Sequence, residues 1–396
     1  MIRRIKIRDF KSIRELDLEI GPLTVLIGRG GSGKSNLVQG IRFLRNLLLN
    51  FQEAIIYELG WERIVPVGET RPKTSIEVFF NIPGTDIEYN YAVAFRTPGQ
   101  QIFPGQIQLA EERLSLGKEQ IYSRKRTDAG QWEWKAVPKI ILGSQVHDEQ
   151  LILGQFPSLQ SAAIANAALS SGIGYYHFPA SALSLDPPPA RGANLFQNVS
   201  GLLDNASNYQ SVLRGITQDF HHPNIRKSLV ASLREVNPSI ESAELESLTN
   251  PYRVVIGHKA GNRIFSLYLD QESDGLRRFY AHLLALYQTP SKLTLIFEEP
   301  ENAIFPGALS LLADEFRAAP RENRGQVILT THSPALLDSF DVDSVRVVDM
   351  RDGYTVVGPV AREQREAVKE HLLNTGELLT VDRARTDEKG LTTQSA

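Results

Sequence analysis

The sequence contains no cysteine, which excludes disulfide bonds, thiolate metal sites and a cysteine nucleophile. No apolar run approaches the roughly 18 residues of a membrane-spanning helix, and Met1–Arg4 leads into an alternating pattern rather than a signal-peptide core. The 43 Lys and Arg residues nearly balance 46 Asp and Glu, so the chain lacks the positive field that holds nucleic acid unaided. We expect a cytoplasmic protein with no membrane partner.

What the chain does contain is ordinary for a globular protein, with 42% hydrophobic and 22% charged residues. These proportions exclude a collagenous, coiled-coil or largely disordered protein. At roughly 100–200 residues per domain, the 396 residues suit two or three domains, or one nucleotide-binding domain with a large insertion.

The first third of the chain shows strand patterns around one helix. Apolar residues over 2–20 predict a hairpin that turns at 9–12, and Leu23–Ile27 predicts a buried parallel strand. A helical pattern follows from Asn36. Two strands are expected in 75–96 and two or three more in 106–137, so an antiparallel β region follows the helix.

The last 120 residues alternate helices and strands, a rhythm typical of a parallel sheet covered by helices. The expected helices are 275–287, 307–317 and 334–339, and the expected strands are 293–297, 327–330 and 345–348. Between the two halves, helices are expected around 158–171 and over much of 194–236, and a strand hairpin lies within 252–269. Three consecutive prolines within 183–192 mark the clearest break.

A phosphate-binding motif lies between the buried strand and the first helix. Gly28-Arg29-Gly30-Gly31-Ser32-Gly33-Lys34-Ser35 matches G-x-x-x-x-G-K-[ST] in the strand, loop and helix context that the motif requires. Glycines let backbone N–H groups surround a phosphate, and the helix N-terminus adds positive potential. We expect Lys34 to reach the β- and γ-phosphates and Ser35 to ligate Mg²⁺.

Two carboxylates follow a later buried strand, at Leu293–Phe297. Glu298 and Glu299 are therefore expected at the carboxyl edge of the sheet, where ligands bind in open α/β folds. We expect Glu298 to hold the Mg²⁺ shell and Glu299 to orient or deprotonate an attacking water. An acidic strand exit is common when it occurs alone, and the phosphate loop favours the catalytic interpretation.

Two further segments are candidates for contact with the nucleotide. His332 follows the strand 327–330, where it could contact a γ-phosphate and sense its loss. The segment Glu272–Arg278 (ESDGLRR) opens a helix with a hydroxyl, a glycine and free N–H groups, which form an anion site. Taken alone, this second segment is an ordinary helix cap.

The order GxxxxGKS, ESDGLRR, FEEPEN and TTHS resembles the ABC-type ATPase heads of the SMC, RecF and OLD group, especially those without coiled-coil arms. The resemblance covers most of the chain and implies a P-loop NTPase with an ABC-ATPase-like mixed sheet, an inserted antiparallel β subdomain and a helical subdomain. It also implies ATP and Mg²⁺ as cofactors and a head-to-tail homodimer in which Ser273 and Gly275 act on the nucleotide of the other subunit, with Glu299 as base and His332 as switch.

The expected nucleotide contacts are the phosphate loop and the signature segment, namely Gly28, Arg29, Gly30, Gly31, Ser32, Gly33, Lys34, Ser35, Asn36, Ser273, Asp274 and Gly275. The expected catalytic residues are Glu299, Glu298 and His332, and the expected metal ligands are Ser35 and Glu298. The chain departs from the family pattern at Glu298, where aspartate is usual, at Gly30, where asparagine is usual, and at Phe305, where histidine is common.

These motifs divide the chain into expected parts. They are an N-terminal ATPase lobe over 1–60, an inserted β-rich and helical region over 61–182, a helical subdomain over 183–270, a C-terminal ATPase lobe over 271–385 and a disordered tail over 386–396. Because Lys34 and Glu299 must meet at one phosphate, we expect the residues between them to form a large insertion between strands of a single sheet.

We predict an ATP-hydrolysing head that couples dimer closure to DNA binding or to a separately encoded effector, in genome maintenance or anti-phage defence. Two alternatives stay open: an ATP-gated regulatory scaffold with slow or no hydrolysis, and an ABC transporter subunit. The 265 positions between Lys34 and Glu299 disfavour the transporter. Only 64 residues follow His332, too few for a toprim nuclease domain, so any nuclease is expected to come from a partner.

Two basic strips are the candidate DNA contacts. Residues 1–50 carry ten Lys or Arg against four Asp or Glu, and Arg124-Lys125-Arg126 lies near Trp132 and Trp134. Basic residues beside aromatic ones can hold a nucleic-acid backbone or stack on bases. The alternative is a solvated face and a half-buried hairpin strand.

Overall fold

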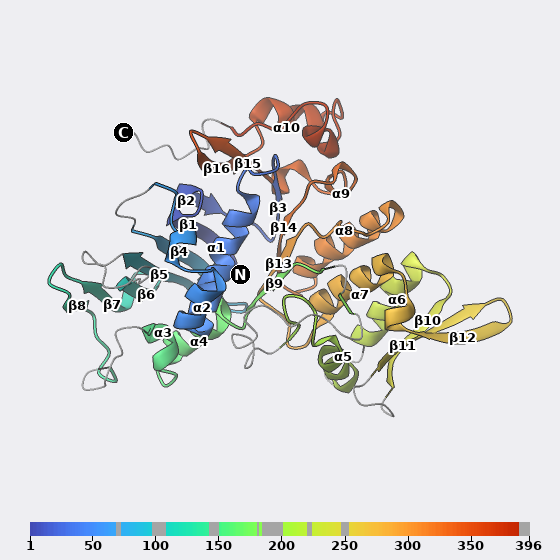
Figure 1. Ribbon diagram of the computed structural model, residues 1–396, viewed down its shortest axis with the longest axis horizontal. Helices are drawn as coiled ribbons and strands as arrows, with labels where there is room; N and C mark the ends of the chain where they lie inside the picture. The colour runs from blue at the N-terminus through green and yellow to red at the C-terminus, as the bar shows by residue number, and fades with distance from the viewer. Residues whose placement is uncertain are drawn as a thin grey trace.

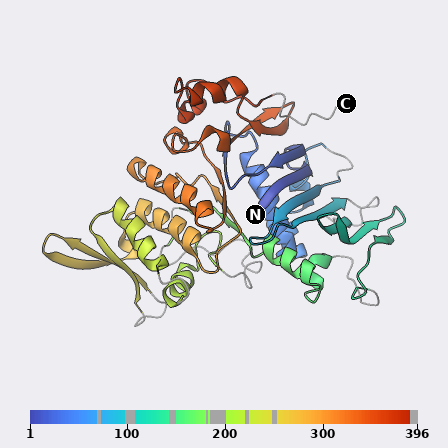
Figure 2. The ribbon, with the colours of Figure 1, turned by 180° about the vertical axis from the view of Figure 1, so that it is seen from behind.

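The computed structural model describes residues 1–68, 73–96, 108–141, 150–179, 182–183, 201–219, 224–246 and 253–387. These residues form a mixed α/β fold with three sheets, and helices cover both faces of the central one (Figures 1 and 2). No helix among the described residues is both long and apolar enough to cross a bilayer.

The largest sheet is antiparallel and starts with the expected hairpin of β1 (Ile2–Phe10) and β2 (Ile13–Glu19). Its seven strands run in the order β2-β1-β4-β5-β6-β7-β8. The five later strands are β4 (Ser75–Asn81), β5 (Glu88–Arg96), β6 (Gln108–Leu116), β7 (Glu119–Arg126) and β8 (Trp132–Lys135). Since β4 pairs with β1, the strands expected as an inserted β subdomain continue the sheet of the first hairpin rather than forming a separate body.

The central sheet has six strands in the order β16-β15-β3-β14-β13-β9, all parallel except the edge strand β16. They are β3 (Leu23–Ile27), β9 (Ile173–Tyr176), β13 (Thr294–Glu298), β14 (Gln326–Thr330), β15 (Val345–Arg351) and β16 (Tyr354–Pro359). Strand β9 belongs to this central sheet although it lies within 61–182, which was expected to be inserted. Its four residues are too short for a periodic signal.

Alternate residues of the central strands enter two separate cores, because successive strand side chains point to opposite faces. Leu26, Ile296 and Ile328 face α1 (Lys34–Leu49) and the antiparallel sheet. Their neighbours Val25, Phe297 and Leu329 face the helices on the other side. Helix α1 therefore lies between the two larger sheets (Figure 1).

The second core is covered by α5 (Tyr209–Gln218), α6 (Ile225–Val236), α7 (Asp274–Tyr287), α8 (Pro306–Arg321) and the short α9 (Pro334–Leu337). Beyond these helices lies a three-stranded sheet of β10 (Ile240–Glu246), β11 (Arg253–Ala260) and β12 (Arg263–Tyr268). The β11–β12 hairpin was expected and β10 was not. The hairpin projects at the far end of the molecule (Figures 1 and 2).

The remaining helices are α2 (Phe51–Tyr57), α3 (Ile152–Gln155), α4 (Gln160–Leu169) and α10 (Arg362–Lys369). Two residues of the tail that was expected to be disordered over 386–396 are ordered, because Thr386 is buried and bridges to Val360, and the N–H of Asp387 donates to Pro359 O. The rest of that tail and most of the proline-rich break lie outside the described residues.

Candidate nucleotide site

The phosphate loop leaves β3 and enters α1 through positions that require glycine. A Cβ on Gly28 would lie 2.0 Å from the carbonyl oxygen of Val348, and a Cβ on Gly33 would lie 1.9 Å from Oγ1 of Thr355. Gly33 also has φ +96° as it caps α1. Both glycines are therefore needed for close backbone approach, as the motif predicts.

A series of side-chain hydrogen bonds connects the phosphate loop and the start of α1 to the β1–β2 turn and to β16. Asn36 Nδ2 donates to Ser12 Oγ at 2.7 Å, Ser12 Oγ lies 2.6 Å from Thr355 Oγ1, and Thr355 Oγ1 donates to the carbonyl of Ser32 at 3.1 Å. Since Thr355 has one proton and gives it to Ser32, Ser12 donates to Thr355. Ser12 and Thr355 were not among the predicted site residues, and no sequence motif marks them.

Lys34 is buried within the loop that it is expected to serve. Its Nζ donates to the carbonyls of Gly28 (2.8 Å) and Arg29 (3.0 Å), and burial lowers its pKa to about 8, against the opposing charges of Glu299 and Glu301. Oγ of Ser32 is buried and has no hydrogen-bond partner among the residues that the structure describes. A desolvated ammonium and an unpartnered hydroxyl are groups that phosphate oxygens satisfy, so these residues fit a nucleotide phosphate.

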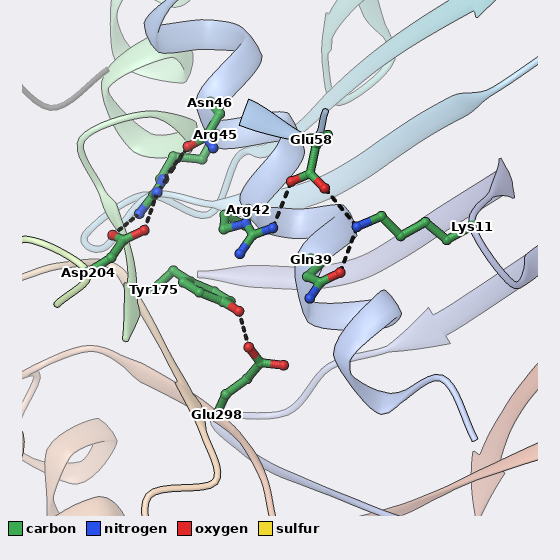
Figure 3. A network of polar contacts seen from close by, with 9 residues as sticks. All are labelled: Lys11, Gln39, Arg42, Arg45, Asn46, Glu58, Tyr175, Asp204 and Glu298. Carbon is green, nitrogen blue, oxygen red and sulfur yellow. Dashed lines mark hydrogen bonds and ion pairs between the residues drawn. The ribbon is translucent and has the colours of Figure 1, made fainter. Parts of the chain in front are cut away.

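The two carboxylates at the end of β13 point in different directions. The hydroxyl of Tyr175 on the neighbouring β9 donates to Glu298 Oε2 (Figure 3). Glu299 has a left-handed backbone with φ +45°, and its N–H donates to both O (3.1 Å) and Oγ1 (3.2 Å) of Thr330 on β14. A strained, non-glycine conformation at this point is typical of functional sites.

Glu299 and His332 meet at the sheet edge, as the strand order predicts. Nε2 of His332 lies 3.7 Å from Glu299 Oε1, and Asn302 Nδ2 donates to Glu299 Oε2 at 2.9 Å. The Glu299 side chain is 39% exposed and the His332 side chain is 41% exposed. The carboxylate is therefore held on one oxygen and accessible to water on the other.

Glu301 supports the histidine segment and was not predicted as a site residue. Its Oε1 accepts hydrogen bonds from Thr331 Oγ1 (2.7 Å), His332 N (2.8 Å) and Ser333 N (3.1 Å). Three donors to one carboxylate oxygen fix the turn that carries His332. Glu301 is the third acid of the FEEPEN segment, and its place beside the two predicted acids is the sequence signal that could have identified it.

A network of polar contacts that includes residues of α1 packs against Tyr175, whose hydroxyl contacts Glu298 (Figure 3). The guanidinium of Arg42 lies 4.8 Å from the Tyr175 ring centroid, and its Nη2 donates to Glu58 Oε1 at 2.7 Å. Lys11 Nζ donates to Glu58 Oε2 at 2.7 Å. Burial raises the pKa of the Tyr175 phenol well above its ordinary value, so the phenol is a neutral donor to Glu298.

Oxygen ligands suited to Mg²⁺ are present at the predicted positions. Ser35 is exposed at the start of α1, and Glu298 is partly exposed, with Oε1 outside the contact to Tyr175. Hydroxyl and carboxylate oxygens are the ligands that Mg²⁺ prefers beside nucleotide phosphates. A bound Mg²⁺ would neutralise charge on those phosphates.

The signature segment lies at the start of α7, where Ser273 Oγ accepts from the N–H of Leu276 at 3.3 Å and Arg277 pairs with Asp274. Arg278 Nη1 donates to the carbonyl of Asn302 at 2.7 Å, which ties this helix to the loop that holds Glu299. Within the ranges that the structure describes, no hydrogen bond joins residues 273–275 to the phosphate loop. One chain does not bring these two predicted parts of the site together.

Two cavities flank the phosphate loop. One of about 880 Å³ is lined by Ser12, Asn36, Gln39, Glu58 and Tyr354, among others. The other, of about 760 Å³, is lined in part by Gly28, Arg29, His332, Arg383 and Arg385. Each of these two cavities is large enough for part of a nucleotide or for a segment of a partner.

In the basic strip near the tryptophans, Lys125 is exposed but the two arginines are buried. Arg124 is fully buried and pairs with Glu112 at 2.8 Å, and Arg126 is 9% exposed. Both guanidiniums lie over the ring of Trp132, at 4.5 and 4.6 Å from its centroid. These arginines stabilise the sheet, and the alternative of a half-buried hairpin strand is correct for them.

Half of the ten basic residues in 1–50 are also engaged within the chain. The ion pairs are Arg4–Asp17, Lys6–Glu77, Lys11–Glu58, Arg42–Glu58 and Arg45–Asp204. Arg3, Arg8 and Arg14 remain exposed. The local positive charge counted from the sequence is therefore much reduced on the folded surface.

Comparison with known proteins identifies the family and the fold of this chain. A family described as "AAA domain, putative AbiEii toxin, Type IV TA system" matches residues 23–338, which is more than half of the chain. Among solved structures, an SMC head bound to the C-terminal winged-helix domain of ScpA has 16% identity and a TM-score of 0.52, over 92% of this chain and 99% of that one.

A second solved structure is the SMC head domain with an extended coiled coil, bound to the C-terminal domain of ScpA, from Pyrococcus furiosus. It has 15% identity and a TM-score of 0.50, over 94% of this chain and 99% of that one. At such identities the likeness establishes the fold. The chain is a P-loop NTPase that belongs to this AAA-domain family, and its fold is that of the ABC-type ATPase heads of the SMC and RecF-like group.

Proposed function

We propose that this protein is a Mg²⁺-dependent ATPase head in which Lys34 and the phosphate loop hold the triphosphate and Glu299 activates the attacking water. The observation that carries the proposal is the meeting of Glu299 with His332 at 3.7 Å, at the edge of the sheet that also bears the phosphate loop. Glu299 Oε1 accepts no hydrogen bond within the described part of the chain. It is therefore free to accept a proton from water.

His332 and Glu301 have supporting roles in this mechanism. Glu301 fixes the 331–333 turn through three hydrogen bonds, so the imidazole of His332 is held next to the base. An imidazole in this place can donate to a γ-phosphate oxygen and can lose that contact when the phosphate leaves. The experiment is phosphate release and nucleotide binding by the full chain, with Lys34→Ala as the binding-deficient comparison.

We further propose that two copies pair head to tail around two ATP molecules. Support comes from the signature segment, because Ser273 is exposed at the N-terminus of α7 and forms no hydrogen bond with the phosphate loop within the described part of the chain. A helix N-terminus offers N–H groups and positive potential to an anion. The signature of one copy would then complete the site at Lys34 of the other.

Complementation between two inactive variants tests this arrangement. Ser273→Asp retains a helix-capping side chain but adds a negative charge against the phosphate, and Ser273→Asn is its neutral control. A mixture of Ser273→Asp and Lys34→Ala chains contains one intact composite site per mixed dimer if the signature acts in trans. We expect phosphate release by the mixture to exceed that of either variant alone, and an unchanged rate would contradict the trans arrangement.

An ATP-gated scaffold is the second candidate function. Glu298 favours it, because this carboxylate is one methylene longer than the aspartate that is usual in the family, which changes the position of the Mg²⁺ ligand. The two candidates differ in turnover. ATP-dependent dimerisation without phosphate release by the wild-type protein would support the scaffold.

We propose that closure is coupled to DNA or to a separately encoded effector. Outside the phosphate loop, Arg3, Arg8 and Arg14 are exposed basic residues of the first strip that could contact DNA phosphates. Binding through them would weaken as salt rises, because phosphate contacts release counterions. Retention on DNA with and without ATP tests this, and a flat response between about 50 and 200 mM salt would count against it.

A further inference from the structure

The contact between Tyr175 and Glu298 joins adjacent strands on one face of the central sheet. Tyr175 is paired with Ile296 in the parallel ladder of β9 and β13, so Glu298 is its diagonal neighbour two residues farther along. Diagonal neighbours are within reach of long side chains. The phenol donates to Glu298 Oε2, and Oε1 is left outside this contact (Figure 3).

Tyr175 is itself held in place by α1, the helix that begins at Lys34. The Arg42 guanidinium lies 4.8 Å from the ring centroids of both Tyr175 and Tyr57. Arg42 donates to Glu58, which also accepts from Lys11 at the β1–β2 turn. Tyr175 is 3% exposed, so its phenol cannot reorient freely.

A glutamate has one more rotatable bond than an aspartate, and a metal ligand must be held in one orientation to bind well. Ligating carboxylates are commonly oriented by hydrogen bonds from neighbouring side chains, and loss of such a partner weakens metal binding. The hydrogen bond from Tyr175 restricts Glu298 in this way without neutralising its charge.

We propose that Tyr175 is a positioning residue that fixes the Glu298 carboxylate for Mg²⁺, and that this contact allows a glutamate to serve where related heads carry aspartate. The proposal rests on the proposed function of the site. It concerns the orientation of one carboxylate and assigns Tyr175 no contact with nucleotide or metal.

The first test is Tyr175→Phe, which removes the hydroxyl and keeps the ring under Arg42. The readout is the Mg²⁺ concentration at half-maximal binding of a fluorescent ATP analogue to the full chain. We expect this concentration to rise by about 10-fold or more, while binding measured without Mg²⁺ is unchanged. A value within twofold of wild type would overturn the proposal.

Tyr176→Phe is a matched control, because it removes a phenol hydroxyl from an equally buried neighbour on the same strand. Tyr176 faces the opposite core, where its hydroxyl accepts a hydrogen bond from Gln288 at 2.8 Å. We expect Tyr176→Phe to leave the Mg²⁺ requirement unchanged. An equal rise in both variants would assign the effect to general loosening of β9 and would contradict the proposal.

Glu298→Asp provides a second, independent test, since the shorter carboxylate lies farther from the phenol and has one rotatable bond fewer to restrict. We expect Tyr175→Phe to have no further effect on the Mg²⁺ requirement in the Glu298→Asp background. The same loss in both backgrounds would mean that Tyr175 acts through packing, against the proposal. If wild-type binding is absent or independent of Mg²⁺, the proposed function fails too; if only the Tyr175 effect is missing, the function stands without this inference.

Discussion

Nε2 of His332 lies 3.7 Å from Oε1 of Glu299, across the ends of two neighbouring parallel strands. The separation is too long for a hydrogen bond and short enough for a charge contact when the imidazole is protonated. Asn302 holds the other oxygen of Glu299 at 2.9 Å. The carboxylate is thus oriented by one partner, while its second oxygen faces the histidine and solvent.

Replacing Glu299 by glutamine should separate hydrolysis from binding. The amide keeps the size of the side chain but cannot accept the proton of the attacking water, so we expect phosphate release to fall by about 10²–10⁴-fold. Nucleotide affinity should change little, because Lys34 and the loop are unaltered. Single-turnover phosphate release and equilibrium binding check the two parts, and equal rates for both proteins would remove Glu299 from the role of base.

Alanine at two glycines of the phosphate loop should have opposite outcomes. A Cβ on Gly28 would overlap the carbonyl oxygen of Val348, whereas no atom lies within 4 Å of the position of a Cβ on Gly30. We expect Gly28→Ala to cost about 2–3 kcal/mol of stability and to abolish nucleotide binding. Gly30→Ala should remain within about 0.5 kcal/mol of wild type. Urea unfolding and nucleotide titration measure both, and equal tolerance of the two changes would refute this loop geometry.

The buried pair of Glu112 and Arg124 should dominate the stability of the antiparallel sheet. Glu112 accepts hydrogen bonds from Arg124, from the hydroxyls of Tyr91 and Tyr122, and from two N–H groups of α3. Glu112→Gln leaves the Arg124 charge buried without a counter-charge, so we expect a loss of about 3–5 kcal/mol. Urea unfolding measures the loss.

Glu111→Gln is the control for this prediction. Glu111 is the preceding residue on the same strand, and its side chain is on the outer face, 3.5 Å from Lys73. Exposed pairs contribute little, so we expect a change below about 1 kcal/mol. Similar losses at the two positions would show that the buried pair is not a special source of stability.

His282 should make the folded state sensitive to acid. It is buried on α7 among Phe178, Phe297 and Phe316, and burial lowers its pKa to about 4 from the ordinary 6.5. Between pH 4 and pH 6.5, His282 binds a proton in the unfolded chain but not in the folded chain. The unfolding free energy therefore falls as pH decreases from 6.5 to 4, by about 3 kcal/mol from this group alone.

His282→Phe should make that pH dependence shallower, because phenylalanine suits the aromatic surroundings and does not titrate. Unfolding in urea at several pH values between 6.5 and 4 measures the slope. The exposed His177 offers a control, and His177→Gln should leave the slope close to that of wild type. An unchanged slope in His282→Phe would mean that other groups cause the acid sensitivity.

Much of the fold followed from local patterns in the sequence. The alternation in 2–20, the apolar run Leu23–Ile27 and the helix–strand rhythm of the last 120 residues are confirmed as β1, β2, β3 and the elements from α7 to β15. The phosphate loop was recognisable because its chemistry depends on residues adjacent in the chain. Glu299 and His332 were expected to lie together because parallel strands end at one edge.

Other features depended on contacts between distant parts of the chain. Strand β9 has four residues and no periodic signal, yet it pairs with β13 and supplies the hydroxyl that contacts Glu298. Arg124 was a candidate DNA contact beside the alternative of a half-buried strand, because sequence spacing does not show which carboxylate pairs with a given arginine. Glu301 was missed since its three donors belong to another strand exit.

The sequence by itself therefore determined the phosphate loop, the central strands and the acids that follow them, because these depend on neighbouring residues and on strand period. Only the tertiary structure decided which charges are neutralised inside the fold and which side chains orient Glu298 and Glu299. The physical reason is that ion pairs and hydrogen bonds join groups far apart in the chain, and their distances are set by how the sheets and helices pack.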